Sequence, residues 1–256
     1  MAHAVEVNRA SVLDGLAHGF LGRIGGVSTG DVAGLNVGLG SGDDSARIAE
    51  NRGRAVDAVL PGARLVTVYQ VHSPDCVTVG AEPWPESARP RADALVTDRR
   101  DLLLGILTAD CAPVLLADRE AGVIGAAHAG WKGAIAGVTD RTIEAMRALG
   151  AHRGRIVAAV GPCITQASYE VDAGFHGRFA AADAANTRFF EPGREGHWQF
   201  DLAGYVVSRL EAAGVGEIER LRLDTYAAPR RFFSFRRSTH RGEAAYGRQI
   251  SLIGLR

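Results

Sequence analysis

The sequence predicts an α+β fold in which mixed β-sheets pack together and helices flank them. Several short β-rich runs follow one another between residues 65 and 127 without helices between them, whereas a doubly wound parallel sheet needs strict alternation. Three longer segments elsewhere have helical periodicity. The 256 residues suffice to bury a sizeable core, and no linker or internal repeat interrupts them. We therefore expect one domain over residues 1–256.

The expected strands are runs of apolar residues, many of them β-branched. They cover residues 65–69, 76–79, 94–97, 103–107, 114–116, 123–127, 156–160 and 249–255. The expected helices have apolar residues at spacings of three and four and cover residues 45–59, 135–149 and 202–213. Gly150 and Gly214 follow the last two and fit C-terminal caps. The Pro-rich segment 82–91 lies between strands and is expected to be a surface loop.

The composition excludes several classes of partner. The chain has 29 basic and 29 acidic residues, so its charge indicates neither a nucleic-acid surface nor a membrane-binding face. The longest apolar runs are too short to span a bilayer. Three widely spaced cysteines do not make a disulfide framework, and no secretory leader is recognised. We expect a cytoplasmic protein that binds a small molecule, with no nucleic-acid or membrane partner.

Polar side chains of three kinds follow expected strands. "VYQVHSPD" presents His72, "GILTADCAP" presents Asp110 and Cys111, and "IGAAHAGWKG" presents His128. Two imidazoles and a thiolate fit a three-ligand zinc site whose fourth position is open, the arrangement of catalytic zinc. The same side chains also fit a cysteine nucleophile with histidine bases. No local motif such as C-x-x-C or H-E-x-x-H decides between these interpretations, and packing alone explains any one of these residues.

The glycine-dense segment 18–44 is the second candidate site. Its backbone amides could hold an anion, with charge supplied by Arg23, although it contains neither a P-loop nor a complete G-x-G-x-x-G. A plain glycine-rich loop explains the segment equally well. Cys76 and Cys163 lie in apolar surroundings, and we assign them no chemistry.

Together these segments resemble the YfiH-like family, whose members are named purine nucleoside phosphorylase, polyphenol oxidase or laccase-domain protein. The resemblance covers nearly the whole chain. It rests, in order, on "HGFLGRIGGVS" (18–28), "LNVG" (35–38), "GDD" (42–44), "ENR" (50–52), "QVH" (70–72), "ADALVTD" (92–98), "TADCAPVLL" (108–116), "AAHAGWKG" (126–133), "GPCI" (161–164), "YEV" (169–171), "FFSFRR" (232–237) and "GRQ" (247–249).

The resemblance implies that His72, Cys111 and His128 are the catalytic and metal-binding residues, with zinc as the metal. It also implies a fold of packed mixed sheets, distantly similar to the catalytic domain of cytotoxic necrotizing factor. Near the C-terminus the chain departs from the family. Asp224 and Thr225 stand where relatives often have Cys-Thr, and extra residues lie between positions 237 and 247.

Five further residues are expected at the substrate pocket by the same resemblance. Arg23, Asn36 and Arg52 would receive phosphate or sugar. Asp93 and Asp110 would hold the metal ligands in orientation.

The function that the resemblance implies is a zinc-dependent purine nucleoside phosphorylase that also deaminates adenosine. Its partners would be a nucleoside and phosphate, and we expect a monomer. A second candidate is a copper-dependent polyphenol oxidase. The chain has eight scattered histidines and no His-x-His pair, so it supports at most one metal site, although Cu²⁺ could displace Zn²⁺ from it. An editing hydrolase of a peptidoglycan precursor and a non-enzymatic binding module also fit the sequence.

Overall fold

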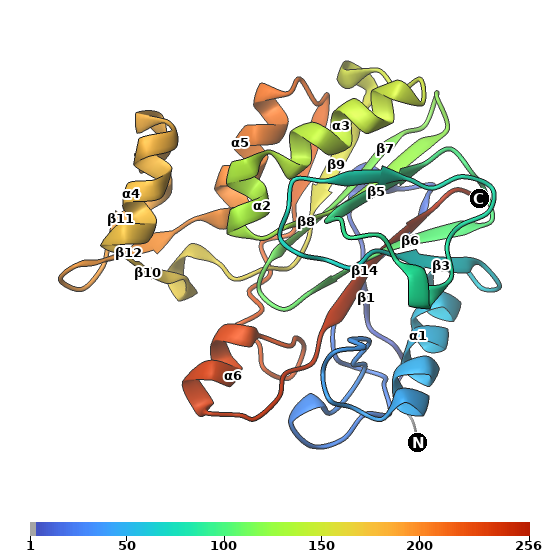
Figure 1. Cartoon of the computed structure of the whole chain (residues 1–256), viewed down its shortest axis with the longest axis horizontal. Coiled ribbons are helices and arrows are strands. Elements are labelled where there is room, and N and C mark those ends of the chain that lie inside the picture. Colours follow the sequence, from blue (N-terminus) through green and yellow to red (C-terminus); the bar gives the residue numbers. More distant parts are fainter. Residues whose placement is uncertain (1–3) are drawn as a thin grey trace.

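Two β-sheets packed face to face form the centre of the computed structural model, and helices cover their outer faces (Figure 1). The structure describes residues 4–256. The predicted fold class, mixed sheets flanked by helices, is confirmed. No helix in this range combines the length and apolar character needed to cross a membrane.

The six-stranded sheet contains both parallel and antiparallel pairs. Its strand order is β13-β9-β7-β8-β5-β4, with β4 parallel to β5 and β13 parallel to β9. The strands are β4 (Cys76–Thr78), β5 (Ala94–Thr97), β7 (Ala112–Asp118), β8 (Val123–Ala129), β9 (Val157–Val160) and β13 (Glu217–Arg220). Strands β7 and β8 form an antiparallel hairpin in which Pro113 pairs with His128.

The five-stranded sheet joins the two ends of the chain. Its order is β1-β2-β14-β6-β3, and only β3 and β6 run parallel. The strands are β1 (Val7–Asn8), β2 (Ala17–Leu21), β3 (Arg64–Thr67), β6 (Leu102–Thr108) and β14 (Gln249–Gly254). Because β14 pairs with β6 over its whole length, C-terminal residues come to lie beside the middle of the chain.

Apolar side chains from both sheets fill the space between them. Leu104 and Ile106 of β6 belong to the same buried cluster as Leu95, Leu115 and Ile124 of the other sheet. The outer face of the six-stranded sheet is covered by α2 (Trp131–Ala136), α3 (Val138–Ala148) and α5 (Leu202–Ala212). The outer face of the five-stranded sheet is covered by α1 (Ser45–Val59).

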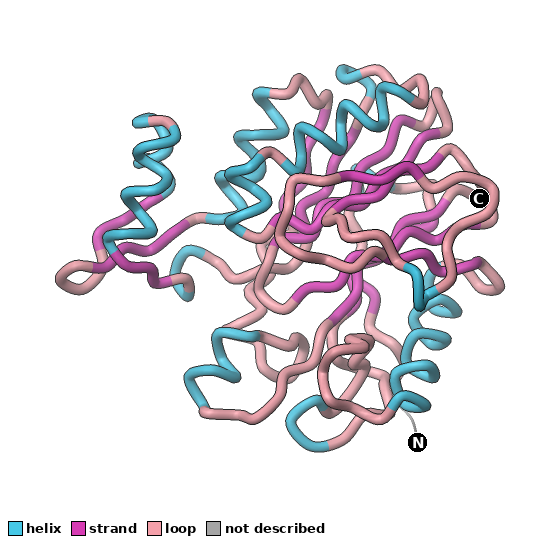
Figure 2. The backbone as a smooth tube through the Cα atoms, in the orientation of Figure 1, coloured by secondary structure: helices cyan, strands magenta, loops and turns pink. Residues whose placement is uncertain are grey.

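A small three-stranded unit projects from one side of the molecule (Figure 2). It consists of β10 (Glu170–Asp172), α4 (Ala173–Ala182), β11 (Phe190–Pro192) and β12 (His197–Phe200). The last helix, α6 (Phe235–Arg241), precedes β14 and is capped by Ser234, whose side chain accepts from the amide of Arg237.

Several predicted elements are confirmed, and others need correction. The helix at 45–59 and the strand at 94–97 have the predicted bounds. The predicted helix 135–149 is instead divided at Gly137, whose φ of 92° ends α2 before α3 begins. Part of the predicted glycine-rich loop is a strand, since residues 17–21 form β2 and all five are buried.

Candidate metal and substrate site

The ends of three strands bring His72, Cys111 and His128 together. His128 lies in β8, Cys111 directly precedes β7, and His72 lies in the loop between β3 and β4. One ligating atom from each residue lies within 4.8 Å of the other two. The Cys111 Sγ is 3.7 Å from His72 Nε2, and the two imidazole rings meet edge to face at a centroid distance of 4.7 Å. The structure therefore assembles the three predicted ligands.

The cluster is this compact because residue 130 is glycine. A Cβ atom on Gly130 would lie 2.6 Å from His72 Cδ2 and 2.9 Å from Cys111 Sγ. Both distances are shorter than van der Waals contact, so any other residue would displace a ligand. In the sequence this glycine is part of "AAHAGWKG".

Asp93 fixes the position of His72 through the backbone. Its buried carboxylate accepts hydrogen bonds from the amides of Val71 (3.1 Å), His72 (2.9 Å) and Ser73 (2.6 Å). His72 has a φ of 62°, a conformation that non-glycine residues seldom adopt. Three hydrogen bonds to one carboxylate thus hold a strained turn that points an imidazole at Cys111.

The same carboxylate orients His128. His128 Nδ1 donates to Asp93 Oδ1 over 2.8 Å, which leaves Nε2 free to face the cluster. Burial acts to raise the pKa of Asp93, but the hydrogen bonds from His128 and from the backbone amides outweigh it and lower the pKa to about 2. A permanently ionised carboxylate behind a histidine is the usual partner of a metal-ligating imidazole.

Cys111 is set apart from the other two cysteines by its neighbours. Burial acts to raise its pKa, yet His128 and His72 lower it to about 6. Burial lowers the pKa of His128, but Cys111 and Asp93 raise it to about 9. Burial raises the pKa of Cys76 and of Cys163 to about 12. Only Cys111 is therefore a ready thiolate, the form that binds metals or attacks substrates.

Asp110, the residue before Cys111, is hydrogen-bonded to the C-terminal part of the chain. Its carboxylate accepts from the hydroxyls of Thr225 (2.7 Å) and Ser234 (2.9 Å) and from the amide of Arg236 (2.7 Å). Burial raises its pKa. Asp110 also has a φ of 88°, so these bonds tie a strained turn before Cys111 to the C-terminal part of the chain.

Asp224, which departs from the family pattern, and its neighbour Thr225 lie in the C-terminal segment that holds Asp110. Thr225 supplies one of the bonds to Asp110. Asp224 accepts from the hydroxyls of Thr165 and Ser168, both at 2.6 Å. Asp224 thus bridges two loops rather than lining the cavity beside the cluster.

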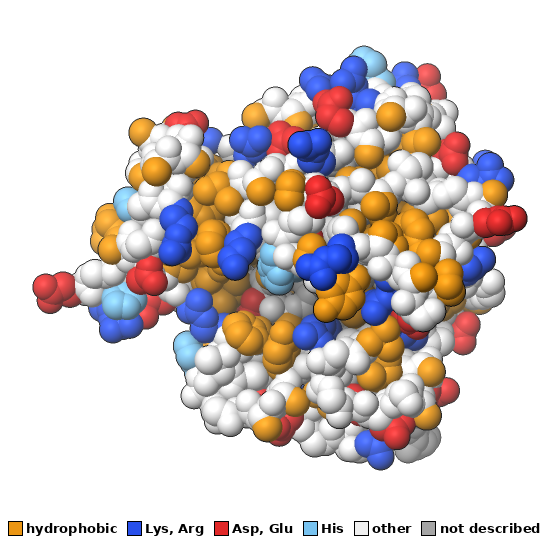
Figure 3. Space-filling model, viewed as in Figure 1, with side chains coloured by type: hydrophobic (Ala, Val, Ile, Leu, Met, Phe, Trp, Pro, Cys, Tyr) orange, Lys and Arg blue, Asp and Glu red, His pale blue; other side chains and the backbone are white. Residues whose placement is uncertain are grey.

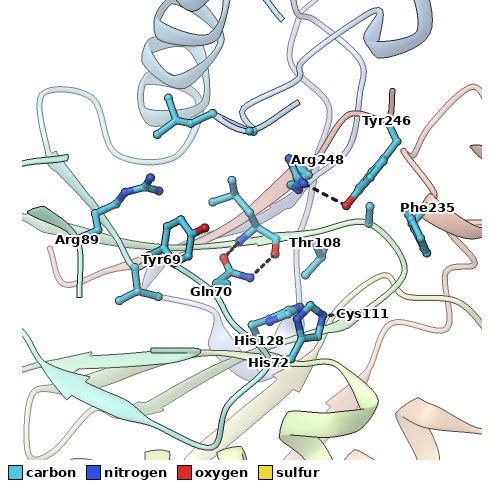
Figure 4. Close-up of a pocket in the computed structure, with 16 residues that line it drawn as sticks. Tyr69, Gln70, His72, Arg89, Thr108, Cys111, His128, Phe235, Tyr246 and Arg248 are labelled. Atoms are coloured by element: carbon cyan, nitrogen blue, oxygen red, sulfur yellow. Dashed lines mark hydrogen bonds between the residues drawn. The ribbon is translucent and has the colours of Figure 1, made fainter. Parts of the chain in front are cut away.

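The cluster opens into a cavity of about 470 Å³, within the size range of small-molecule sites. Figure 3 shows the hollow near the centre of one face, bordered by histidine, basic and apolar side chains. Figure 4 shows its lining from both sheets and from the C-terminal segment. Besides the three cluster residues, the cavity is lined by the side chains labelled in Figure 4: Tyr69, Gln70, Arg89, Thr108, Phe235, Tyr246 and Arg248.

The three residues predicted to receive phosphate or sugar do not line this cavity. Arg23 is turned into the protein, where Nε and Nη2 donate to the carbonyl of Ala33 and Nη1 to that of Pro229. Arg52 donates to the carbonyl of Val37, pairs with Glu86 and lines a second cavity. Protein partners occupy the Arg23 guanidinium, whereas Arg52 keeps one buried nitrogen, Nη2, without a partner among the described residues. Neither arginine faces the cavity beside the cluster, so their positions do not support the predicted contacts there.

Asn36 acts on the cavity indirectly. Its fully buried side chain accepts from the amides of Gly38 (3.1 Å) and Arg248 (3.0 Å), two residues that line the cavity. Arg89, Phe235, Tyr246 and Arg248 are cavity residues that the sequence alone did not reveal as such. Two of the quoted motifs contained a signal for them, since "FFSFRR" includes Phe235 and "GRQ" places Arg248 just before the last strand.

The cluster fits a transition metal by the chemistry and spacing of its donors. In a tetrahedral site with zinc–nitrogen and zinc–sulfur bonds, neighbouring donors lie about 3.3 to 3.6 Å apart. The 3.7 Å between Cys111 Sγ and His72 Nε2 is close to this spacing. Two imidazoles, one thiolate and a side open to the cavity suit zinc and also copper.

Comparison with known proteins gives one family and several close relatives. Residues 17–256 match the family model described as "multi-copper polyphenol oxidoreductase laccase". A purine nucleoside phosphorylase of Deinococcus radiodurans is 44% identical over 240 residues, which cover 93% of this chain and 88% of the relative. A purine nucleoside phosphorylase of Streptomyces griseus is 41% identical over 252 residues, covering 93% and 96%.

Solved structures agree over nearly the full length. A Neisseria meningitidis protein superposes with a TM-score of 0.87 at 31% identity and covers 98% of this chain and 99% of its own. The hypothetical protein YfiH of Bacillus licheniformis gives a TM-score of 0.89 at 28% identity, with coverage of 100% and 97%.

Proposed function

The chain belongs to the YfiH-like, laccase-domain family, and we propose that it is a zinc-dependent purine nucleoside phosphorylase that also deaminates adenosine. One observation carries the proposal: a His₂Cys cluster with an ionised carboxylate behind it faces a cavity large enough for a nucleoside. The names of its similar relatives support the choice of nucleosides as the substrate class.

The reaction needs two substrates in this cavity. An oxygen of phosphate attacks C1′ of the ribose, the C1′–N9 bond breaks with its electron pair on N9, and the base takes up a proton. The products are the free purine and ribose 1-phosphate. Adenosine deamination instead adds water at C6 and releases ammonia, so it needs no phosphate.

Different residues of the cavity would bind the metal, orient its ligands and contact the base. His72, Cys111 and His128 would hold the zinc ion, and Asp93 keeps both imidazoles oriented towards it. Bound there, zinc would supply a Lewis acid beside the substrate. Tyr69, which lines the cavity, offers an aromatic ring for stacking a purine base.

Product analysis with metal-defined protein tests the proposal. With adenosine and phosphate, the zinc form should release adenine and ribose 1-phosphate, and leaving out phosphate should stop base release while inosine continues to form. Cys111→Ala should lose both activities. Absence of both products from adenosine, inosine and guanosine would refute the proposal.

The description of the family model favours a second candidate, a copper-dependent polyphenol oxidase. Against a multicopper enzyme, residues 4–256 contain one cluster of three or more metal-ligating side chains. Oxidation of phenols by protein with stoichiometric copper, together with absent phosphorolysis, would favour the oxidase. Binding and hydrolysis of a peptidoglycan precursor would favour the editing hydrolase.

Domain organisation, oligomeric state and location are proposed from the sequence. We retain a single domain over residues 1–256, a monomer and a cytoplasmic location. Light scattering on purified protein tests the monomer.

A further inference from the structure

Arg248 is held rigidly at the wall of the cavity. A Cβ atom on Gly38 would lie 2.9 Å from Arg248 Nη1, and one on Gly40 would lie 4.0 Å from it, so the guanidinium rests on this glycine turn. Its Cζ lies 4.7 Å from the centroid of the Tyr246 ring, and Nη2 donates to the Tyr246 hydroxyl over 3.1 Å. The turn and the aromatic ring therefore preorganise the guanidinium before any ligand arrives.

Within residues 4–256, the positive charge of Arg248 and Arg89 at this wall of the cavity has no acidic partner. Among the described residues, no carboxylate pairs with Arg248 or Arg89, and no aspartate or glutamate lines the cavity. Arg89 donates only to a carbonyl, that of Glu86. Two arginines in a hollow free of acidic side chains make it attractive to anions.

A buried hydroxyl without a partner lies in the same cavity. Thr108 is 3% exposed, and its Oγ1 has no hydrogen-bond partner in the part of the chain that the structure describes. Thr108 pairs with Gln249 in the register of β6 and β14, which places it next to Arg248 in the sheet. Figure 4 shows Thr108 between Arg248 and the histidines. A buried donor without a partner is costly unless a ligand satisfies it.

We propose that Arg248 and Thr108, with Arg89 at the rim, form the subsite that holds the phosphate substrate. The planar guanidinium can bind two phosphate oxygens at once, and the threonine hydroxyl can donate to a third. Leu39 and Gly40 are exposed residues of the same turn that line the cavity, and their amides, which donate to no described residue, can add further donors. This inference rests on the proposed phosphorolysis, since that reaction requires phosphate in the cavity.

The test compares Arg248→Gln with a matched control, Arg230→Gln, which removes the same charge from an exposed residue outside the cavity. In zinc-loaded protein, Arg248→Gln should raise the KM for phosphate by about 10- to 100-fold, the range for losing a charge-assisted hydrogen bond. The KM for inosine should stay within about twofold. Thr108→Val should raise the KM for phosphate by about 3- to 10-fold, as for a neutral hydrogen bond. The control should resemble the wild type.

Calorimetric titration with inorganic phosphate gives a measurement independent of turnover. The wild type and Arg230→Gln should bind phosphate, and Arg248→Gln should bind it at least about tenfold more weakly. A phosphate KM and affinity unchanged in Arg248→Gln would overturn the subsite while leaving phosphorolysis intact. If the wild type does not phosphorolyse nucleosides, the proposed function fails, and the titration alone decides whether Arg248 binds phosphate.

Discussion

Replacing Asp93 by asparagine tests how the cluster is held. The two carboxylate oxygens together accept four hydrogen bonds: Oδ1 from the His72 amide and His128 Nδ1, and Oδ2 from the amides of Val71 and Ser73. An asparagine keeps one acceptor oxygen and places an NH₂ group where the other oxygen stood. Whichever way the amide is turned, two buried donors then face another donor.

The magnitude follows from these contacts. Hydrogen bonds to a charged group contribute about 1.5 to 3 kcal/mol each, so losing two costs about 3 to 6 kcal/mol. Because a partner behind a metal-ligating histidine affects metal binding, zinc affinity should also fall by about 10- to 100-fold. Asp98→Asn is the control, since Asp98 is exposed, and it should change stability by less than about 0.5 kcal/mol.

Stability against pH gives a second measure of the same carboxylate. The pKa of Asp93 is lowered from 3.8 to about 2 in the folded protein. The ionised carboxylate therefore adds its full share to the free energy of unfolding above pH 3.8, and this share is lost as the pH falls through 2. The difference corresponds to about 2 kcal/mol. Urea unfolding of metal-free protein between pH 5 and pH 2 should show this loss in the wild type and not in Asp93→Asn. Equal urea midpoints at pH 7 and equal zinc affinity in the two proteins would refute the reasoning.

Three further predictions concern the cluster. The protein should purify with about one zinc per chain, and Cys111→Ala should lose it in elemental analysis; full retention would contradict the ligand set. At pH 7, iodoacetamide should label Cys111 in metal-free protein but neither Cys76 nor Cys163, because their pKa values are about 6, 12 and 12, and zinc should block the labelling. Mass spectrometry that finds Cys76 labelled first would contradict this. Gly130→Ala should lower zinc affinity by at least about tenfold, since its Cβ would displace His72, while circular dichroism stays unchanged; wild-type affinity in a zinc competition assay would contradict the packing argument.

Local patterns predicted the elements whose stability is largely local. Helix α1 has an apolar stripe at regular spacing and begins after Asp44, whose side chain caps it by accepting from two amides. Strand β2 was missed because "AHGFL" contains His18 and Gly19. His18 is buried there because its Nε2 accepts from the amide of Ala10, a contact that no local pattern reveals. Strand β13 was missed because three of its four residues are charged. It forms through parallel pairing with β9, which lies about 60 positions earlier in the chain.

Some residues of the site were likewise indicated by local sequence, whereas others are placed by contacts between distant parts of the chain. The polar residues after apolar strands indicated His72, Cys111 and His128 as candidates, and the family resemblance selected them as one site. In the structure His72 follows β3 of the five-stranded sheet, Cys111 connects β6 to β7, and His128 lies in β8 of the six-stranded sheet, so both sheets contribute to the cluster. The position of Arg248 at the wall of the cavity could not be predicted in this way. Asn36 and the Arg248 amide that it binds are separated by 212 positions, and they meet only because β14 returns to the centre of the five-stranded sheet.

The glycine-dense N-terminal segment shows why we propose Arg248 and not Arg23 as the residue that contacts the anion. Glycine density was consistent with amides that cradle an anion beside Arg23. Yet a Cβ on Gly26 would lie 2.2 Å from Leu35, and one on Gly34 would lie 2.1 Å from the Arg23 carbonyl, so these glycines serve close backbone packing. The Arg23 guanidinium donates to the carbonyls of Ala33 and Pro229, and its Cζ lies 4.6 Å from the centroid of the Phe233 ring. These contacts within the protein leave it turned away from the cavity. What the segment contributes to the cavity is the turn at Gly38, whose missing side chain leaves room for Arg248. The N-terminal glycine turn thus positions the charge of Arg248, which lies directly before β14, so the anion site that we propose needs both ends of the chain.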